Sequence, residues 1–485
     1  ALTTTEAATL SAAQAKALTT AQVQQLTTDN VKALNLTSVK AMTSTQLQAL
    51  STTQLNALET EDFANLNDAQ ITGLTTAQVQ ALTTSAVTSL SADQVSKFTT
   101  AQVAVVTTTN VGALNSDQVA ALTTAQVGTL DTAQVKAITT SAVAAMTIAQ
   151  VGAMSTTQVA ALTTSQMAAL TANEVKSLST SQVQALSSTQ INALTNANVA
   201  AFTTTQVASL TAGQVTGLST SAAASLVTAQ VQALSTSQVQ AISTANVAAM
   251  SSTQLSALTT GQVSALTTAQ VVALETSDVA ALSTGQVAAL STAQVNVLET
   301  ADIAAMSTGQ VAALSTAQVQ ALSNANVTAL STSQVQAMGT AQVNALSTAQ
   351  VVAMTTGQVA SLTAAQVKGM STDQVKALEN ADVQVLNATQ IKALTTAQVQ
   401  ALETTDVAGL NTTQLAALTA DQVSALTTAQ VVSLTTTEVS NLSYDQVKAL
   451  TTTQLQAVET ADVAVLNSDQ VSSLSATQVQ AFTTA

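Results

Sequence analysis

The sequence has no Cys, Pro, His, Trp or Arg, and it has only one Tyr and four Phe among 485 residues. The absence of Cys excludes disulfides and is compatible with any redox compartment. Because His, Cys and Arg are missing and every Ser and Thr lies within a repeat, no residue is distinguished as a nucleophile or general base. We therefore expect no enzymatic activity, no cofactor and no catalytic or metal centre.

Charge is also scarce: only 7% of the residues are charged, with 25 acids against 10 lysines and a net charge of −15. The lysines form no basic run, so the chain lacks the positive patch that nucleic acid phosphates require. No stretch approaches the roughly 20 consecutive apolar residues of a membrane-spanning helix. We expect neither nucleic acid binding nor membrane insertion.

What the chain does contain is one octapeptide, with the consensus Leu-Ser/Thr-Thr-x-Gln-Val-x-Ala. Counted from Leu2 as position one, sixty complete octads precede a partial one at Phe482. Apolar residues make up 47% of the chain, which is enough for regular packing and unlike a disordered segment. The sequence predicts a single uninterrupted repeat array over residues 1–485. Because it begins at position eight of one octad and stops partway through another, we interpret it as a window of a longer array.

Three local structures could have this period. A strand solenoid suits Thr and Val, but it needs Gly or Asn at its corners, and the 13 Gly are scattered. In one continuous helix each octad would advance the apolar face by about 80°, so that Leu would wind around the axis and form no seam. The third possibility is a very short helix in every octad.

The short helix is favoured by a capping box in most repeats. Ser or Thr at position two and Gln at position five have the spacing of this motif, and Leu at position one and Val at position six have that of a hydrophobic staple. In a typical octad, Thr75 is the expected N-cap, Gln78 reaches back to its amide, and Leu74 packs on Val79.

The charges indicate the same helix register. All 25 acids lie at positions two to five, and the 10 lysines lie at position seven, except Lys97 at position eight. Acids stabilise the first turn of a helix and cations the last. Helices this short are unstable alone, so they must be held by stacking of the Leu, Val and Ala faces. The predicted fold is all-α: a solenoid of very short capped helices, one per octapeptide.

A second period is present at position five, where Gln is replaced in every third or fourth octad, with one gap of seven octads and one exception at Ser38. The distance from Glu6 to Asp462 is fifty-seven octads. It contains seventeen intervals between successive substitutions, if the gap of seven octads is counted as one interval of three and one of four. We interpret the quotient, about 3.35 octads, as one coil of the solenoid. The substituted residues would then form a line along one side.

We expect this line to contact another part of the assembly or a second chain, because shorter or charged residues replace Gln there. Where Glu is the N-cap, position five is Asp each time. Such a pair could share a cation, although it lacks the further oxygen ligands that Ca²⁺ prefers, and favourable helix-dipole charge is the simpler interpretation. The candidate contact stripe consists of Asn30, Asp62, Ala86, Asn110, Ala142, Glu174, Asn198, Ala222, Asn246, Asp278, Asp302, Asn326, Asp382, Asp406, Glu438 and Asp462.

The repeat resembles the tandem Leu-Thr-Thr-Ala-Gln-Val-x-Ala arrays of very long, mostly proteobacterial proteins described as adhesin-like, haemagglutinin-like or haem-utilisation proteins. The segments Leu122 to Thr129 and Leu314 to Ala321 carry the pattern, and the resemblance extends over the whole chain. It implies a secreted or cell-surface location. A role in haem binding has no support, because the chain lacks His and Cys and its Met residues mostly occupy the Leu position.

From these observations we expect a structural fibre, the shaft of a bacterial cell-surface filament or giant adhesin, with lateral contacts between identical chains. The alternative is a binding module whose repeated face holds a glycan, ice or another surface ligand. Regular Ser and Thr hydroxyls favour the alternative, but their role as helix caps already explains them.

Overall fold

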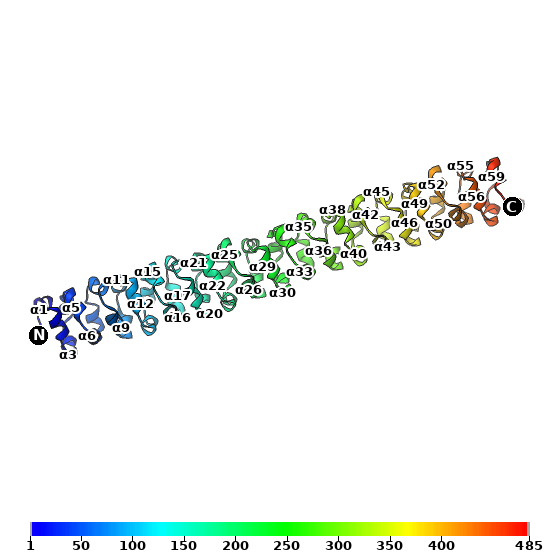
Figure 1. Ribbon diagram of the computed structural model, residues 1–485. Helices are drawn as coiled ribbons and strands as arrows, with labels where there is room; N and C mark the ends of the chain where they lie inside the picture. Colours follow the sequence, from blue (N-terminus) through cyan, green and yellow to red (C-terminus); the bar gives the residue numbers. More distant parts are fainter. Residues whose placement is uncertain (1, 483–485) are drawn as a thin grey trace. The chain divides into compact units, whose positions relative to one another are not determined.

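The computed structural model describes residues 2–482, and the regular structure of this range is entirely helical, with sixty short helices (Figure 1). They run from α1 (Thr4–Ala8) to α60 (Ala476–Ala481), and helix αn begins at residue 8n − 4, which is position three of its octad. Each helix is four to six residues long. The predicted all-α solenoid of one short helix per octad is confirmed.

Most helix starts have the predicted capping box. At α10 (Thr76–Ala81), the Thr75 hydroxyl accepts a hydrogen bond from the Gln78 N–H at 3.1 Å, and Gln78 Oε1 accepts one from the Thr75 N–H at 2.9 Å. Two of the backbone donors that an α-helix start leaves unpaired are thereby satisfied within the octad. The sequence therefore determines where each helix begins.

The helix ends need no special residue. After α10 the chain passes directly into extended backbone at Leu82, with φ −54° and ψ 136°, and the Leu82 N–H donates to the Val79 carbonyl. Within residues 2–482 there is no positive φ and no cis peptide bond. Since neither a left-handed turn nor a cis bond is used, the fold needs neither Gly nor Pro at its corners.

The core consists of the side chains at positions one and six. Val79 and Leu82 are 1% and 5% exposed, and the same two positions are buried along most of the described chain. Helices of this length gain almost nothing from isolated helix formation, so burial between successive coils provides their stability.

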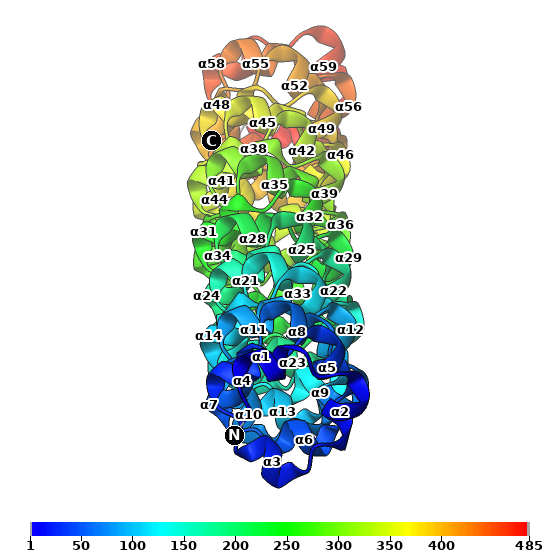
Figure 2. The ribbon, with the colours of Figure 1, turned by 90° about the vertical axis from the view of Figure 1, so that its left-hand side faces the viewer.

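The chain forms two compact units, which divide between Met250 and Ser251. Within each unit, the closely packed helix pairs are three positions apart, as for α46 (Ala364–Gly369) and α49 (Ala388–Ala393), which lie one above the other in Figure 2. The octad register is unchanged at the division, where Ser251 caps the next helix. The single uninterrupted array expected over residues 1–485 stays a prediction.

Hydrogen bonds between successive coils agree with the predicted coil length. The Asn56 side chain donates to the Ala81 carbonyl, 25 residues later, whereas the Gln78 side chain donates to the Leu50 and Leu47 carbonyls, 28 and 31 residues earlier. These separations bracket the length of a coil of about 3.35 octads, which is roughly 27 residues.

Gly217 and Gly128 differ in how closely the neighbouring coil approaches them. A Cβ at Gly217 would lie 2.6 Å from the Cβ of Ser188, whereas a Cβ at Gly128 would have nothing within 4 Å. We expect Gly217→Ala to lower the free energy of unfolding by about 1–3 kcal/mol through overpacking. Gly128→Ala should raise it by about 0.5–1 kcal/mol, because Ala is the better helix former. Urea unfolding of the two variants would measure this, and equal shifts would contradict the close approach.

Candidate functional site

The repeated polar site of the solenoid is the glutamine at position five. Gln318 is 2% exposed, and its Oε1 accepts a hydrogen bond from the Ser315 N–H at 2.7 Å. Its Nε2 donates to the carbonyls of Val287 and Leu290 in the preceding coil, at 2.9 and 2.7 Å. One amide therefore caps its own helix and links two coils.

The octad sequence predicts only the first of these two roles. The capping box uses Oε1 of the glutamine and leaves Nε2 with two donors. Because a buried donor must find an acceptor, the carbonyls of the preceding coil are the natural partners. No buried side-chain nitrogen or oxygen in the described part of the chain lacks a hydrogen-bond partner.

The residues of the candidate contact stripe lie in this same buried position. Each of them is 6% exposed or less, so their side chains face the solenoid interior and cannot touch a second chain. Helices that carry substitutes three octads apart do pack together, as α8 (Thr60–Ala64) with Asp62 packs on α11 (Thr84–Ser89) with Ala86. The expected contact through these side chains is therefore corrected: shortening Gln changes the joint between coils.

Asn keeps one of the two functions of Gln at this position. The Nδ2 of Asn110 donates to the Leu82 carbonyl at 2.8 Å, and that of Asn326 donates to the Leu298 carbonyl at 3.0 Å. Both acceptors lie 28 residues earlier. The shorter amide does not reach back to its N-cap N–H, so the coil link is retained and half of the capping box is lost.

Asp at the same position keeps the other function. Asp62 Oδ2 accepts a hydrogen bond from the Glu59 N–H at 3.0 Å, which preserves the cap. Burial raises the pKa of Asp62, and this effect is larger than the lowering of the pKa by the hydrogen bond. The charges of Glu59 and Glu61 raise the pKa further. A carboxylate has no proton to donate to the preceding coil.

Burial likewise raises the pKa of Asp382, Asp406 and Asp462, each of which follows a Glu N-cap. Within the described residues, no three side chains of His, Cys, Asp or Glu form a group that could hold a metal ion. Each Glu–Asp pair therefore lacks the additional carboxylate ligands of a calcium site.

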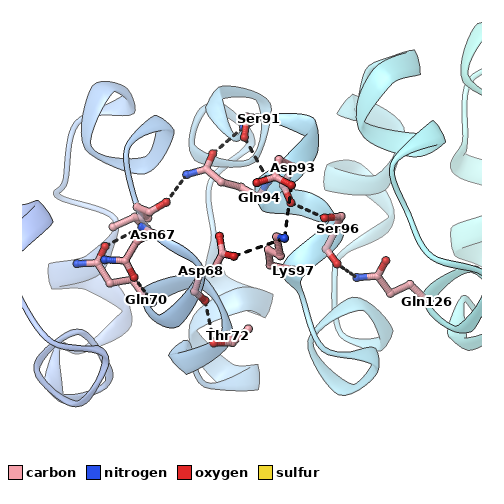
Figure 3. Close-up of polar contacts among 11 residues, drawn as sticks. Asn67, Asp68, Gln70, Thr72, Ser91, Asp93, Gln94, Ser96, Lys97 and Gln126 are labelled. Carbon is pink, nitrogen blue, oxygen red and sulfur yellow. Dashed lines mark hydrogen bonds and ion pairs between the residues drawn. The ribbon is translucent and has the colours of Figure 1, made fainter.

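Lys97, the lysine at position eight, makes two ion pairs on the surface. Its Nζ lies 3.4 Å from Asp68 Oδ2 and 3.5 Å from Asp93 Oδ1, so it joins successive coils (Figure 3). The two carboxylates raise the Lys97 pKa, Asp68 more than Asp93. All three side chains are more than a third exposed, and such pairs contribute little stability.

The outward surface of an octad consists mainly of positions two to four and seven. In the octad from Leu394, Thr396, Ala397 and Gln400 are exposed, while Gln398 and Val399 are buried. Most octads therefore present hydroxyls and small side chains to solvent and few charges. Of the described helices, none is long and apolar enough to cross a membrane.

A family model for the ALTTAQ repeat matches the chain in tandem and covers more than half of it. The matched residues are 55–92, 95–132, 119–156, 127–164, 144–172, 164–196, 238–268, 271–301, 295–332, 325–356, 352–380, 375–405 and 399–436. The chain belongs to the ALTTAQ repeat family. No curated protein matches it. The ALTTAQ octad is thus the unit of both the sequence and the structure, and its Gln makes the bond between coils.

Proposed function

We propose that this ALTTAQ array is a structural fibre, the shaft of a bacterial cell-surface filament or giant adhesin. The observation that carries the proposal is the buried Gln of successive octads, which caps its own helix and bonds to the preceding coil. Because each octad contacts only nearby coils, the same joint can be added without limit.

The surface and composition agree with this role. The exposed positions carry mostly small polar residues, and the chain has no Cys, so the stacking would not depend on disulfides or on the redox state outside the cell. We propose an extracellular location and no enzymatic activity. Lateral association with identical chains would use these exposed positions, since position five is buried.

Electron microscopy of the purified chain and of a chain lengthened by whole octads tests the proposal. A structural shaft should appear as unbranched particles whose length increases in proportion to the number of octads. Particles whose length does not depend on the number of octads would refute it.

The alternative, a repeat-face binding module, is favoured by the exposed hydroxyls of positions two to four. The lengthened chain also separates the two functions. Selective retention on a glycan or ice surface, increasing with octad number and abolished by Thr→Ala at exposed position three, would support binding. Equally weak retention on all surfaces, whatever the number of octads, would support the structural shaft.

A further inference from the structure

Eight octads place a carboxylic acid in the buried position of the inter-coil glutamine. All eight side chains are 6% exposed or less. This is unusual for acids, which are seldom fully buried without a charged or hydrogen-bonding partner. The eight residues are Asp62, Glu174, Asp278, Asp302, Asp382, Asp406, Glu438 and Asp462.

The asparagines at the same position show what an acid lacks. At Asn30, Asn198 and Asn246 the Nδ2 donates to the Leu carbonyl 28 residues earlier, at 2.7, 2.6 and 2.9 Å. A protonated Asp has nearly the shape of Asn and carries one O–H that can donate in the same direction. An ionised Asp cannot donate at all.

Asp382 gives the geometry of one such joint. Its Oδ2 accepts a hydrogen bond from the Glu379 N–H at 3.4 Å, and the equivalent backbone carbonyl of the preceding coil belongs to Met354. Its helix α48 (Asn380–Gln384) packs against α45 (Thr356–Ser361), which has no charged residue. It also packs against α51 (Thr404–Ala408), which carries Asp406 and is capped by Glu403.

The charged groups on these packed elements are therefore all acids, and neither α45 nor α51 supplies a cation to Asp382. An ionised Asp382 is buried next to Glu379, which disfavours its charge. The neutral acid removes this repulsion and can complete the missing bond.

We propose that the octads of Asp62, Asp382, Asp406 and Asp462 are proton-operated joints, in which the protonated carboxyl donates to the position-one carbonyl of the preceding coil and closes the link between coils. Deprotonation leaves that link open. Acidification would thus tighten the solenoid at chosen coils, and neutral pH would loosen it there. This inference rests on the fold and is independent of the proposed fibre function.

Two of the eight acids provide a contrast within the molecule. The Ser252 hydroxyl donates to Asp278 Oδ1 at 2.7 Å, and the Thr276 hydroxyl donates to Asp302 Oδ1 at 3.0 Å. In these octads a hydroxyl of the preceding coil already donates to the carboxyl group, so a hydrogen bond between the coils is present. Their joints should respond less to pH than that of Asp382.

The direction of the pH dependence follows from the raised pKa values of Asp62, Asp382, Asp406 and Asp462. A group whose pKa is higher in the folded than in the unfolded chain binds protons preferentially when folded. Its contribution to stability is least above the folded pKa and increases as the pH falls through that value toward the unfolded pKa of about 3.9.

The test compares the full chain with Asp382→Asn/Asp406→Asn, which keeps the shape and supplies a permanent donor. Hydrogen exchange of the amides around these residues, corrected for intrinsic rates, is followed from pH 7 to 4.5. In the parent chain we expect protection to increase about two- to tenfold on acidification. The variant should have this protection already at pH 7 and show no further increase.

Asp373→Asn is the matched control, because Asp373 is an exposed acid in the neighbouring helix and its loss changes the charge in the same way. It should retain the pH dependence of the parent chain. Loss of the dependence in Asp373→Asn would assign the effect to general charge repulsion and overturn the proposal. So would a double variant whose local protection at pH 7 equals that of the parent.

Discussion

Replacing Val351 by Asp is expected to open the solenoid around α44 (Thr348–Val352) and to lower the free energy of unfolding by about 3–5 kcal/mol. Val351 is at position six and 0% exposed, so the carboxylate would be buried among apolar side chains with no partner. Urea unfolding followed by circular dichroism would measure the loss, and hydrogen exchange would locate it in the coils that contact α44.

The next residue provides a control with identical chemistry. Val352 is in the same helix but 48% exposed, so Val352→Asp places the same charge in solvent. We expect a loss of less than about 1 kcal/mol, mainly because an acid in the last turn opposes the helix dipole. Similar losses for Val351→Asp and Val352→Asp would mean that the core does not lie where positions one and six place it.

Replacing Gln366 by Met should cost about 2–5 kcal/mol, although Met has a similar volume and is more apolar. Gln366 accepts a hydrogen bond from the Thr363 N–H at 2.7 Å and donates to the Val335 and Met338 carbonyls, each at 2.8 Å. Met leaves all three groups without this partner, and the carbonyls face the preceding coil. The variant should therefore lose amide protection in both coils.

Gln336→Met is the matched control, because Gln336 is at the exposed position seven of the octad that Gln366 contacts. This change removes no buried hydrogen bond and should alter the unfolding midpoint only slightly. If Gln366→Met were equally mild, water would have to replace the amide, and the glutamine would be a cap without a role in stacking.

The local part of this fold can be predicted from sequence because its cause is local. Thr75 and Gln78 are three residues apart, and their reciprocal bonds need no information from another coil. The sorting of acids and lysines along the octad reports the helix direction for the same reason. The spacing of the substitutions also predicts the coil length, and the hydrogen bonds between coils, which join residues 25 to 31 apart, agree with it.

The role of position five was not accessible in the same way. The Nε2 of Gln78 reaches carbonyls 28 and 31 residues earlier, separations that are not multiples of eight. These acceptors are backbone atoms, so no side-chain pattern records them. The sequence alone therefore predicts an external contact for shortened residues such as Asp62 and Ala86, whereas their burial shows that the joint inside the solenoid differs there.

The constant offset of the glutamine bond also bears on how such a gene can change. Gln318 and Gln366 both find the carbonyl 28 residues before them at position one of an octad. Recombination that adds or removes whole octads leaves every later Gln facing an equivalent carbonyl, so copy number can vary without a defective coil. A deletion that is not a multiple of eight would misalign these bonds over about one coil, after which the register recovers. Selection on packing alone would thus keep the octad intact while leaving the number of octads free.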